Sequence, residues 1–315
     1  MKTVPTIDVI IPVFNGEYFI EKALRSVDRQ TCEPSRIIVV DDGSTDKTEE
    51  IVLAFKSASA IPVEYIKQEN RGPNAARNKG ISVSSGELLA FLDTDDVWEP
   101  AKLEKQLAVF NGSEWNDLGL VYCAYSLIAE DDSIIIDKSA VTLDPSYRGH
   151  VFDKVLEANK IMGSASAVLI KKECFDSVGL FDESLKASED WDMWIRIAEK
   201  YAIDYVNEPL VKIRRHPGNF QKKYEYMLVN DILFFNKWIE RLPKDKVPKR
   251  WKNTIATLVF LGLPSLHFLP IAKAKLSVKA REVLFKKYGG IELFIFLSIF
   301  KKAGKLPQKI YKRYV

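Results

Sequence analysis

Acidic residues gather in two short segments, and each segment follows an apolar run. Asp93, Asp95 and Asp96 form DTDD after LLAFL, and Asp41 and Asp42 open DDGSTD after IIVV. Carboxylates this close repel one another unless a cation or solvent screens them, and Mg²⁺ or Mn²⁺ prefers such oxygen ligands. The same residues could instead form solvated turns that cap the next helix. The spacing therefore predicts either a divalent cation site or capping turns.

Three other segments carry side chains that could take part in catalysis or binding. Glu189 and Asp190 precede Trp191 in SEDWDMWIR, where partial desolvation would make a carboxylate a better base. Arg77, in NRGPNAARNKG, offers a guanidinium fork that suits phosphate. His216, in RRHPGNF, could bind a metal or a phosphate. The alternatives are a helix cap with core tryptophans, an exposed basic helix and a structural histidine.

These side chains need elements that hold them, and the first hundred residues alternate buried-type strands with helices. Continuous apolar strands separated by helices indicate a mostly parallel sheet covered on both faces. Open α/β sheets bind ligands beyond the carboxyl ends of their strands, which is where the acidic segments lie. We expect strands at 9–13, 37–40, 62–67, 88–92, 121–128, 134–136, 166–170, 202–206 and 210–214, and helices at 18–30, 45–56, 74–83 and 191–200.

The order of these segments over residues 6–220 resembles that of a family 2 inverting glycosyltransferase with the GT-A fold. The order is a strand, DDGSTD, the ARN helix, a strand with DTDD, MGSAS, ED before a tryptophan helix, and RH. The resemblance implies an α/β fold of GT-A type, with a mostly parallel nucleotide-binding sheet flanked by helices. It also implies a catalytic domain at 1–222. The composition of residues 223–315 predicts a separate helical, basic region that could associate with a membrane.

The resemblance assigns roles to individual residues. It implies that Asp190, beside Glu189, is the general base. It implies Mn²⁺ or Mg²⁺ as cofactor, with Asp95 favoured as the main ligand. The implied metal ligands are Asp95, Asp93, Asp96 and His216, and the implied donor nucleotide-binding residues are Pro12, Asn15, Asp41, Asp42, Arg77, Asn78 and Asp93.

The implied reaction moves a sugar from a nucleotide-sugar, by the family's habit a UDP-sugar, to an acceptor hydroxyl. The implied acceptor is a glycan or a lipid-linked precursor of a surface polysaccharide. A nucleotide-sugar-binding protein without turnover is the alternative, although carboxylates at both Asp95 and Asp190 argue against it. A dinucleotide-binding dehydrogenase fits poorly, because FNGEYF follows the first strand where G-x-G-x-x-G would be required.

Positive charge is concentrated in residues 237–315, which contain 19 Lys and Arg but 4 Asp and Glu, while the whole chain has a net charge of +3. The uncharged stretch 253–272 is long enough to span a bilayer, but two prolines and a histidine weaken that interpretation. Apolar runs flanked by Lys and Arg favour a helix lying on an anionic membrane surface. A helical subdomain with a solvated basic face is the other interpretation.

We therefore expect a cytoplasmic enzyme that is peripheral at the inner face of the cell membrane. The amino-terminal apolar run is interrupted by Asp8 and Pro12, which is unlike a signal peptide. Cys32, Cys123 and Cys174 form no CxxC pair, so neither a zinc site nor a disulfide framework is expected. No nucleic-acid recognition motif is present, so nucleic acid is not an expected partner. The sequence indicates no oligomeric state.

Overall fold

The structure of the protein is a computed structural model that describes the chain up to His216 almost completely. The labelled elements belong to the first of two compact units, Met1–Val155 with Asn159–Gly218, except for the end of helix α5 (Phe152–Glu157). The apolar stretches 253–272 and 291–300 lie outside the described residues. The described residues are 5–136, 143–161, 164–216, 230, 232–234, 236–238 and 241.

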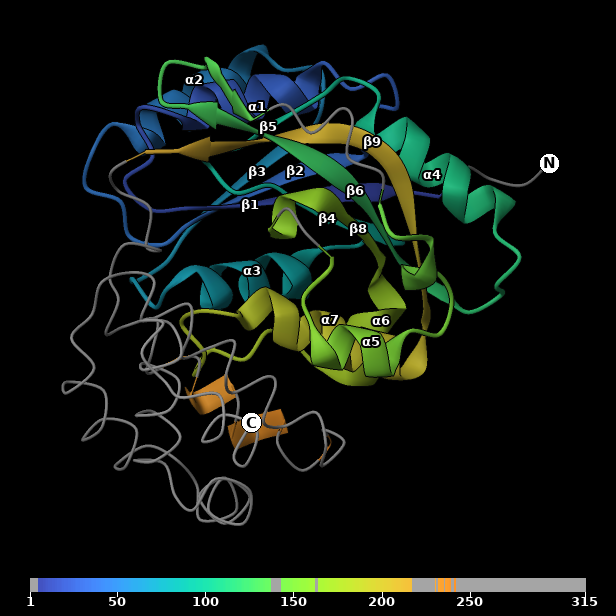
Figure 1. Ribbon diagram of the computed structural model, residues 1–315. Helices are drawn as coiled ribbons and strands as arrows, with labels where there is room; N and C mark the ends of the chain where they lie inside the picture. The colour runs from blue at the N-terminus through green and yellow to red at the C-terminus, as the bar shows by residue number, and fades with distance from the viewer. Residues whose placement is uncertain are drawn as a thin grey trace, which may run out of the picture. The chain divides into compact units, whose positions relative to one another are not determined.

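Nine strands in the described part of the chain form one sheet (Figure 1). They are β1 (Ile7–Val13), β2 (Arg36–Asp41), β3 (Val63–Lys67), β4 (Leu88–Phe91), β5 (Val97–Trp98), β6 (Leu118–Ala129), β7 (Ile134–Ile136), β8 (Val168–Lys171) and β9 (Ala202–Arg215). Their order is β3-β2-β1-β4-β8-β6-β9-β5, and β7 pairs with β6.

The amino-terminal half of this sheet is parallel, as the continuous apolar strands predict. β1 pairs in parallel with β2 and with β4, and β2 pairs in parallel with β3. β8 is antiparallel to both β4 and β6, whereas β6 and β9 are parallel. Because β2 and β4 flank β1 on opposite sides, the carboxyl ends of these strands form a switch point of the kind that binds ligands in α/β sheets.

Helices cover both faces of the sheet (Figure 1). On one face lie α1 (Ile20–Asp28), α2 (Thr48–Ala58) and α4 (Lys102–Gly112), whose apolar side chains share one buried cluster with alternate residues of β1. On the other face lie α3 (Pro73–Val83), α6 (Lys172–Val178) and α7 (Glu189–Lys200). Short 3₁₀ helices at Pro145–Tyr147 and Ala165–Ala167 complete the described elements.

Helix α3 lies unusually close to β1 because Gly80 has no side chain. A Cβ added at Gly80 would lie 2.4 Å from Cγ2 of Ile10, well inside van der Waals contact. This close approach holds the buried face of α3, with Arg77 and Asn78, beside the carboxyl end of the sheet.

Residues 202–215 form one strand where the sequence predicts two. Pro209 has no N–H for the ladder, but the register of β9 against β6 shifts at Ala124, which pairs with Pro209. Such an irregularity accommodates a proline without ending the strand. The prediction of two strands was therefore wrong, and the single long strand carries the chain directly to His216.

Candidate active site

The turn after β4 sends its three carboxylates to different surroundings. The turn is closed by a hydrogen bond from the main-chain nitrogen of Asp96 to the carbonyl of Asp93, 3.0 Å long. The side chains of Asp93 and Asp95 are 24% and 28% exposed, whereas Asp96 is 3% exposed. Only the first two can therefore face a ligand from this turn.

Asp93 forms an ion pair that crosses to the tryptophan helix. Nη2 of Arg77 lies 2.7 Å from Oδ1 of Asp93, and Nη1 of the same guanidinium lies 3.4 Å from Oε1 of Glu189. The Arg77 side chain is 7% exposed, and the two neighbouring carboxylates hold its pKa above the ordinary value against the opposing effect of burial. Arg77 thus joins the DTDD turn to the ED pair.

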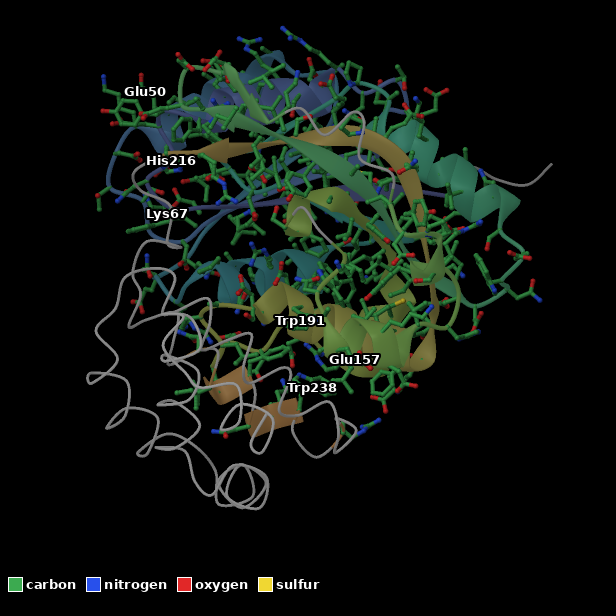
Figure 2. All side chains as sticks on the ribbon, viewed as in Figure 1. Glu50, Lys67, Glu157, Trp191, His216 and Trp238 are labelled. Atoms are coloured by element: carbon green, nitrogen blue, oxygen red, sulfur yellow. The ribbon has the colours of Figure 1, made fainter. Side chains whose placement is uncertain are left out.

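Asp95 faces the end of β9. Its Oδ2 lies 3.1 Å from Nε2 of His216, which follows the last residue of that strand (Figure 2). Burial and the charge of Asp93 raise the pKa of Asp95, and the hydrogen bond with His216 opposes that rise. The imidazole is also 5.1 Å from the ring of Phe19, centroid to centroid, at the start of α1.

Asp96 turns inward and is held by the protein itself. Its Oδ2 accepts hydrogen bonds from Oγ of Ser166 at 2.6 Å and Oγ of Ser164 at 3.2 Å. Its Oδ1 accepts from the main-chain nitrogen of Arg214 at 3.2 Å. Burial, with the charges of Asp95 and Asp93, raises the pKa of Asp96 well above its ordinary value.

Asp190 sits in the first turn of α7, after Ser188 in a left-handed conformation with φ of 60°. Burial and the charge of Glu189 raise the pKa of Asp190 to about 7, although a hydrogen bond from the Trp191 nitrogen and the charge of Arg77 oppose the rise. The negative charge of Asp93 contributes to raising the pKa of Asp190, as it does for Asp95. The two acidic segments are therefore near enough to influence each other's protonation.

The acidic residues after β2 organise the neighbouring loops. Asp41 is fully buried and accepts from the main-chain nitrogen of Ser44 at 2.6 Å and from the hydroxyl of Tyr65 at 2.5 Å. Asp42 accepts from the main-chain nitrogens of Arg71 at 2.9 Å and Gly72 at 2.7 Å, just before α3 begins. Asp41 thus fixes the turn after β2, and Asp42 fixes the loop that leads into α3.

The loop after β1 is tied to both neighbouring strand ends. Asn15 has a positive φ of 50°. Its Oδ1 accepts a hydrogen bond from the main-chain nitrogen of Thr45 at 2.9 Å, and its main-chain nitrogen donates to Oγ of Ser44. The carbonyl of Pro12 accepts from Oγ1 of Thr94 at 2.7 Å. These bonds fix the path of the loop between the two acidic segments.

Asn78 points toward the segment that precedes α7. Its Oδ1 accepts from the nitrogen of Phe181 at 2.9 Å, and its Nδ2 donates to the Phe181 carbonyl at 2.9 Å and to Glu183 at 3.2 Å. Asn74 holds the same segment through the carbonyls of Asp182 and Leu185. One buried face of α3 therefore fixes the segment that leads to Glu189 and Asp190.

The structure brings five of the residues that the sequence singles out into direct contact, in two groups. Asp93, Arg77 and Glu189 are linked directly, and Asp95 contacts His216. The sequence did not identify Ser166 or Arg214 as individual site residues, although both lie in the quoted segments MGSAS and RRHPGNF. A serine within a small-residue segment and an arginine two residues before the histidine were the available signals.

Neither a metal-binding cluster nor a membrane-spanning helix is found among the described residues. In the parts of the chain that the structure describes, no three His, Cys, Asp or Glu residues form a group able to hold a metal ion. Asp95 and His216 nevertheless offer one oxygen and one nitrogen donor side by side. No described helix has the length and apolar content that crossing a bilayer requires.

Comparisons with known proteins identify the family of the chain. The family model described as glycosyltransferase like family 2 matches residues 8–249. An uncharacterized glycosyltransferase of Rickettsia typhi is 34% identical over 213 residues, which are 67% of this chain and 64% of that protein. The match thus spans less than two thirds of that relative's length. TuaG of Bacillus subtilis (strain 168), whose description is a teichuronic acid biosynthesis glycosyltransferase, is 30% identical over 288 residues, covering 88% of this chain and 98% of TuaG.

Solved structures share the fold. TarS of S. aureus, residues 1–349 in complex with UDP-GlcNAc, superposes with a TM-score of 0.61 at 16% identity, covering 95% of this chain and 92% of TarS. Its complex with UDP superposes with a TM-score of 0.60 at 17% identity. The expected α/β fold of GT-A type is confirmed by this likeness and by the sheet described above.

Proposed function

The chain is a member of glycosyltransferase family 2, and from this premise we propose that it transfers a sugar from a nucleotide-sugar to an acceptor hydroxyl, with inversion at the anomeric carbon. The observation that carries the proposal is the bridge through Arg77, which links Asp93 of the DTDD turn to Glu189 of the ED pair. This link supports a single reaction centre in which one acidic segment serves the donor and the other serves the acceptor.

Asp95 and His216 are the residues that would hold Mn²⁺ or Mg²⁺. Neighbouring donors in an octahedral shell with bonds of about 2.1 Å lie about 3 Å apart. The separation of 3.1 Å between Oδ2 of Asp95 and Nε2 of His216 fits two such positions. Phosphate oxygens and water commonly supply the other ligands of these ions. When bound, the ion would stabilise the negative charge that develops on the leaving diphosphate.

The other two carboxylates of the turn receive different roles in this proposal. Asp93 is partly exposed and faces the donor while Arg77 holds it in place. Asp96 would act as a support of the turn, because Ser166 and the main chain of Arg214 occupy its carboxylate. This choice between Asp95 and Asp96 follows from exposure, because the side chain of Asp95 is partly exposed and Asp96 is buried.

Asp190 is the proposed general base. As the acceptor oxygen forms its bond to C1 of the sugar, the bond from C1 to the diphosphate oxygen breaks and the acceptor proton passes to the Asp190 carboxylate. A pKa of about 7 suits this task, because the base is then substantially ionised near neutral pH and still holds a proton well. Glu189 supports the raised pKa through its negative charge and anchors Arg77.

The loops after β1 and β2 form the proposed binding site of the nucleotide. Asn15 and Pro12 shape the first loop, and Asp41 and Asp42 shape the second through hydrogen bonds to main-chain groups. On this proposal Asp41 and Asp42 act mainly by presenting the loop backbone to the base and ribose. Arg77 and Asn78, at the other border, fix the surroundings of the diphosphate through the α3 face.

A UDP-sugar is the proposed donor, and a surface-polysaccharide or lipid-linked precursor is the proposed acceptor. The support is that TarS has been solved with UDP-GlcNAc and that TuaG is described by teichuronic acid biosynthesis.

The proposed site of action is the cytoplasmic face of the membrane, with the basic region 223–315 as the attachment. Sedimentation of the full chain with anionic but not with zwitterionic vesicles is the expected result, and equal sedimentation would reject the attachment.

The decisive experiment measures release of the nucleoside diphosphate. Purified protein is incubated with Mn²⁺ and a panel of nucleotide-sugars, with and without candidate acceptors, and free nucleoside diphosphate is quantified. We expect Mn²⁺-dependent release from one UDP-sugar that rises when an acceptor is added, and loss of this release in Asp190→Asn. Tight binding of a UDP-sugar without any release would instead favour the alternative, a binding protein without turnover.

A further inference from the structure

A buried cation lies directly behind the Asp95–His216 pair. The side chain of Arg214, near the end of β9, has no exposed surface. Its Nε donates to the carbonyl of Asp95 at 2.9 Å. Its Nη1 donates to the carbonyls of Ala129 and Glu130, each at 3.0 Å. Its Nη2 lies 2.6 Å from Oδ1 of Asp132.

These contacts join segments that are far apart in the sequence. Ala129, Glu130 and Asp132 belong to the turn between β6 and β7, where Asp132 has φ of 69° and also pairs with Lys22 of α1. The guanidinium carbon of Arg214 lies 5.1 Å from the ring centroid of Phe19 at the start of α1. The DTDD turn, the β6–β7 turn and the start of α1 therefore all contact the guanidinium of Arg214.

Arg214 constrains both partners of the neighbouring pair. Through its side chain it holds the carbonyl of Asp95, and through its main-chain nitrogen it holds the carboxylate of Asp96. His216 follows two residues later, and its ring lies tilted against Phe19, the same ring that Arg214 lies over. Arg214 therefore contacts Asp95 directly and shares the Phe19 ring with His216.

We infer that Arg214 is a positioning residue that fixes the Asp95–His216 donor pair for a divalent cation and its bound nucleoside diphosphate. The inference rests on the proposed function. Lysine keeps the charge of arginine but lacks the planar fork, so it cannot serve four acceptors on three sides at once. Groups that support metal ligands from outside typically change metal affinity by about 10-fold to 100-fold when they are removed.

The test compares Arg214→Lys with the wild-type chain by measuring Mn²⁺ binding in the presence of UDP, by calorimetry and by the electron paramagnetic resonance of free Mn²⁺. We expect Mn²⁺ to bind Arg214→Lys about 10-fold more weakly. We also expect the reaction rate of this variant to recover at high Mn²⁺, whereas Asp190→Asn does not recover. A purely structural role would lower the melting temperature without this selective dependence on Mn²⁺.

Arg36→Lys is the matched control. Arg36 is another arginine held by several acceptors, 2.9 Å from Asp8 and 2.7 Å from Glu64, but its side chain is partly exposed and it begins β2 at the opposite end of the sheet. We expect this variant to lose stability while keeping the wild-type affinity for Mn²⁺. If Arg214→Lys does not fold, Asp132→Asn removes one partner of the guanidinium and is expected to weaken Mn²⁺ binding in the same direction.

Wild-type Mn²⁺ affinity in folded Arg214→Lys, or in Asp132→Asn where that variant is the one tested, overturns the inference. An equal loss of Mn²⁺ affinity in Arg36→Lys also overturns it, because general destabilisation would then be sufficient. Failure of the wild-type chain itself to bind Mn²⁺ with UDP rejects the proposed metal-dependent function. These results are distinct, since the last is seen without any substitution.

Discussion

Nη2 of Arg77 lies 2.7 Å from Oδ1 of Asp93, and this ion pair ties helix α3 to the DTDD turn. The same guanidinium reaches Glu189, the neighbour of the proposed base. The arginine comes from α3, which the small residue Gly80 brings close to β1. The distance between the two acidic segments is therefore set by helix packing as well as by the loops that carry them.

Replacing Arg77 by glutamine is expected to damage catalysis more than binding of UDP. The change leaves Asp93 and Glu189 without their shared cation, and removing one partner of a buried pair costs about 3–5 kcal/mol. It also removes the positive charge that lowers the pKa of Asp190. We expect kcat/KM to fall roughly 100-fold, the scale of a 1 Å misplacement, and the acidic limb of its pH profile to move to higher pH.

Arg25→Gln is the control for Arg77→Gln, because Arg25 forms an exposed pair with Glu21 on α1. Exposed pairs of this kind contribute little. Steady-state kinetics from pH 5.5 to about 8.5, a range chosen to bracket a carboxylate with a raised pKa, would show both effects. An unchanged acidic limb in Arg77→Gln would mean that its charge does not act on the base.

The proposed base makes turnover sensitive to pH near neutrality. Burial and Glu189 raise the pKa of Asp190 to about 7, and the base must be ionised to accept the proton. The rate should therefore fall as the pH drops below about 7. Glu189→Gln removes the neighbouring negative charge, so the pKa of Asp190 should fall and the acidic limb should move to lower pH. A shift to higher pH would contradict this assignment.

Asp190→Asn tests the role of the general base without changing the proposed metal ligands. Loss of a general base typically lowers the rate by about 10²–10⁴-fold. Binding of UDP with Mn²⁺ should remain, because Asp95 and His216 are unchanged in this variant. Near wild-type kcat in Asp190→Asn, measured with the acceptor at saturation, would remove Asp190 from the role. The hydrogen bond from the Trp191 nitrogen to Asp190 can be kept by the asparagine oxygen, so folding should be preserved.

The sequence was sufficient to locate the strands whose ends carry the site. Apolar runs that stop abruptly at Asp41 and near Asp93 mark the carboxyl ends of β2 and β4, because burial of a parallel strand on both faces leaves no room for charge until the strand emerges. The long strand β9 was predicted as two strands, 202–206 and 210–214, and its pairing with β6 shows that an irregular register at Pro209 keeps the strand continuous.

The sequence could not predict which groups the side chains of the site contact. The spacing within DTDD does not by itself separate Asp95 from Asp96, because the difference between them depends on Ser166, which lies 70 residues further along the chain and donates a buried hydrogen bond to Asp96. Likewise, Asn78 was expected beside the diphosphate, and its amide contacts Phe181, 103 residues away. Local spacing predicts which residues cluster, but long-range packing decides which atoms remain available to a ligand.

Asp95→Asn and Asp96→Asn form a matched pair that tests this distinction. Asp95 is partly exposed and contacts His216, so its loss should weaken Mn²⁺ binding in the presence of UDP by about 10-fold or more, equivalent to about 1.4 kcal/mol. Asp96 is buried against Ser166, so asparagine there should mainly alter stability. Calorimetry of both variants with UDP and Mn²⁺ checks the order. A larger loss in Asp96→Asn would exchange the two roles.

Asp8 provides a prediction about stability that is independent of the reaction. Its buried carboxylate accepts from Arg36 at 2.9 Å, from Oγ of Ser84 at 2.7 Å and from the nitrogens of Ser85 and Gly86 at 3.0 Å each. Burial alone would raise the pKa of Asp8, but these donors together lower it from 3.8. A pKa that is lower in the folded state means that the carboxylate stabilises the fold above pH 3.8 and loses that contribution as the pH falls through the folded value.

We expect Asp8→Asn to lower the free energy of unfolding by about 1–3 kcal/mol at pH 7. The difference from wild type should shrink as both proteins are acidified below pH 3.8. Urea unfolding at several pH values measures this difference, and a gap that stays constant with pH would show that shape, and not charge, makes Asp8 important.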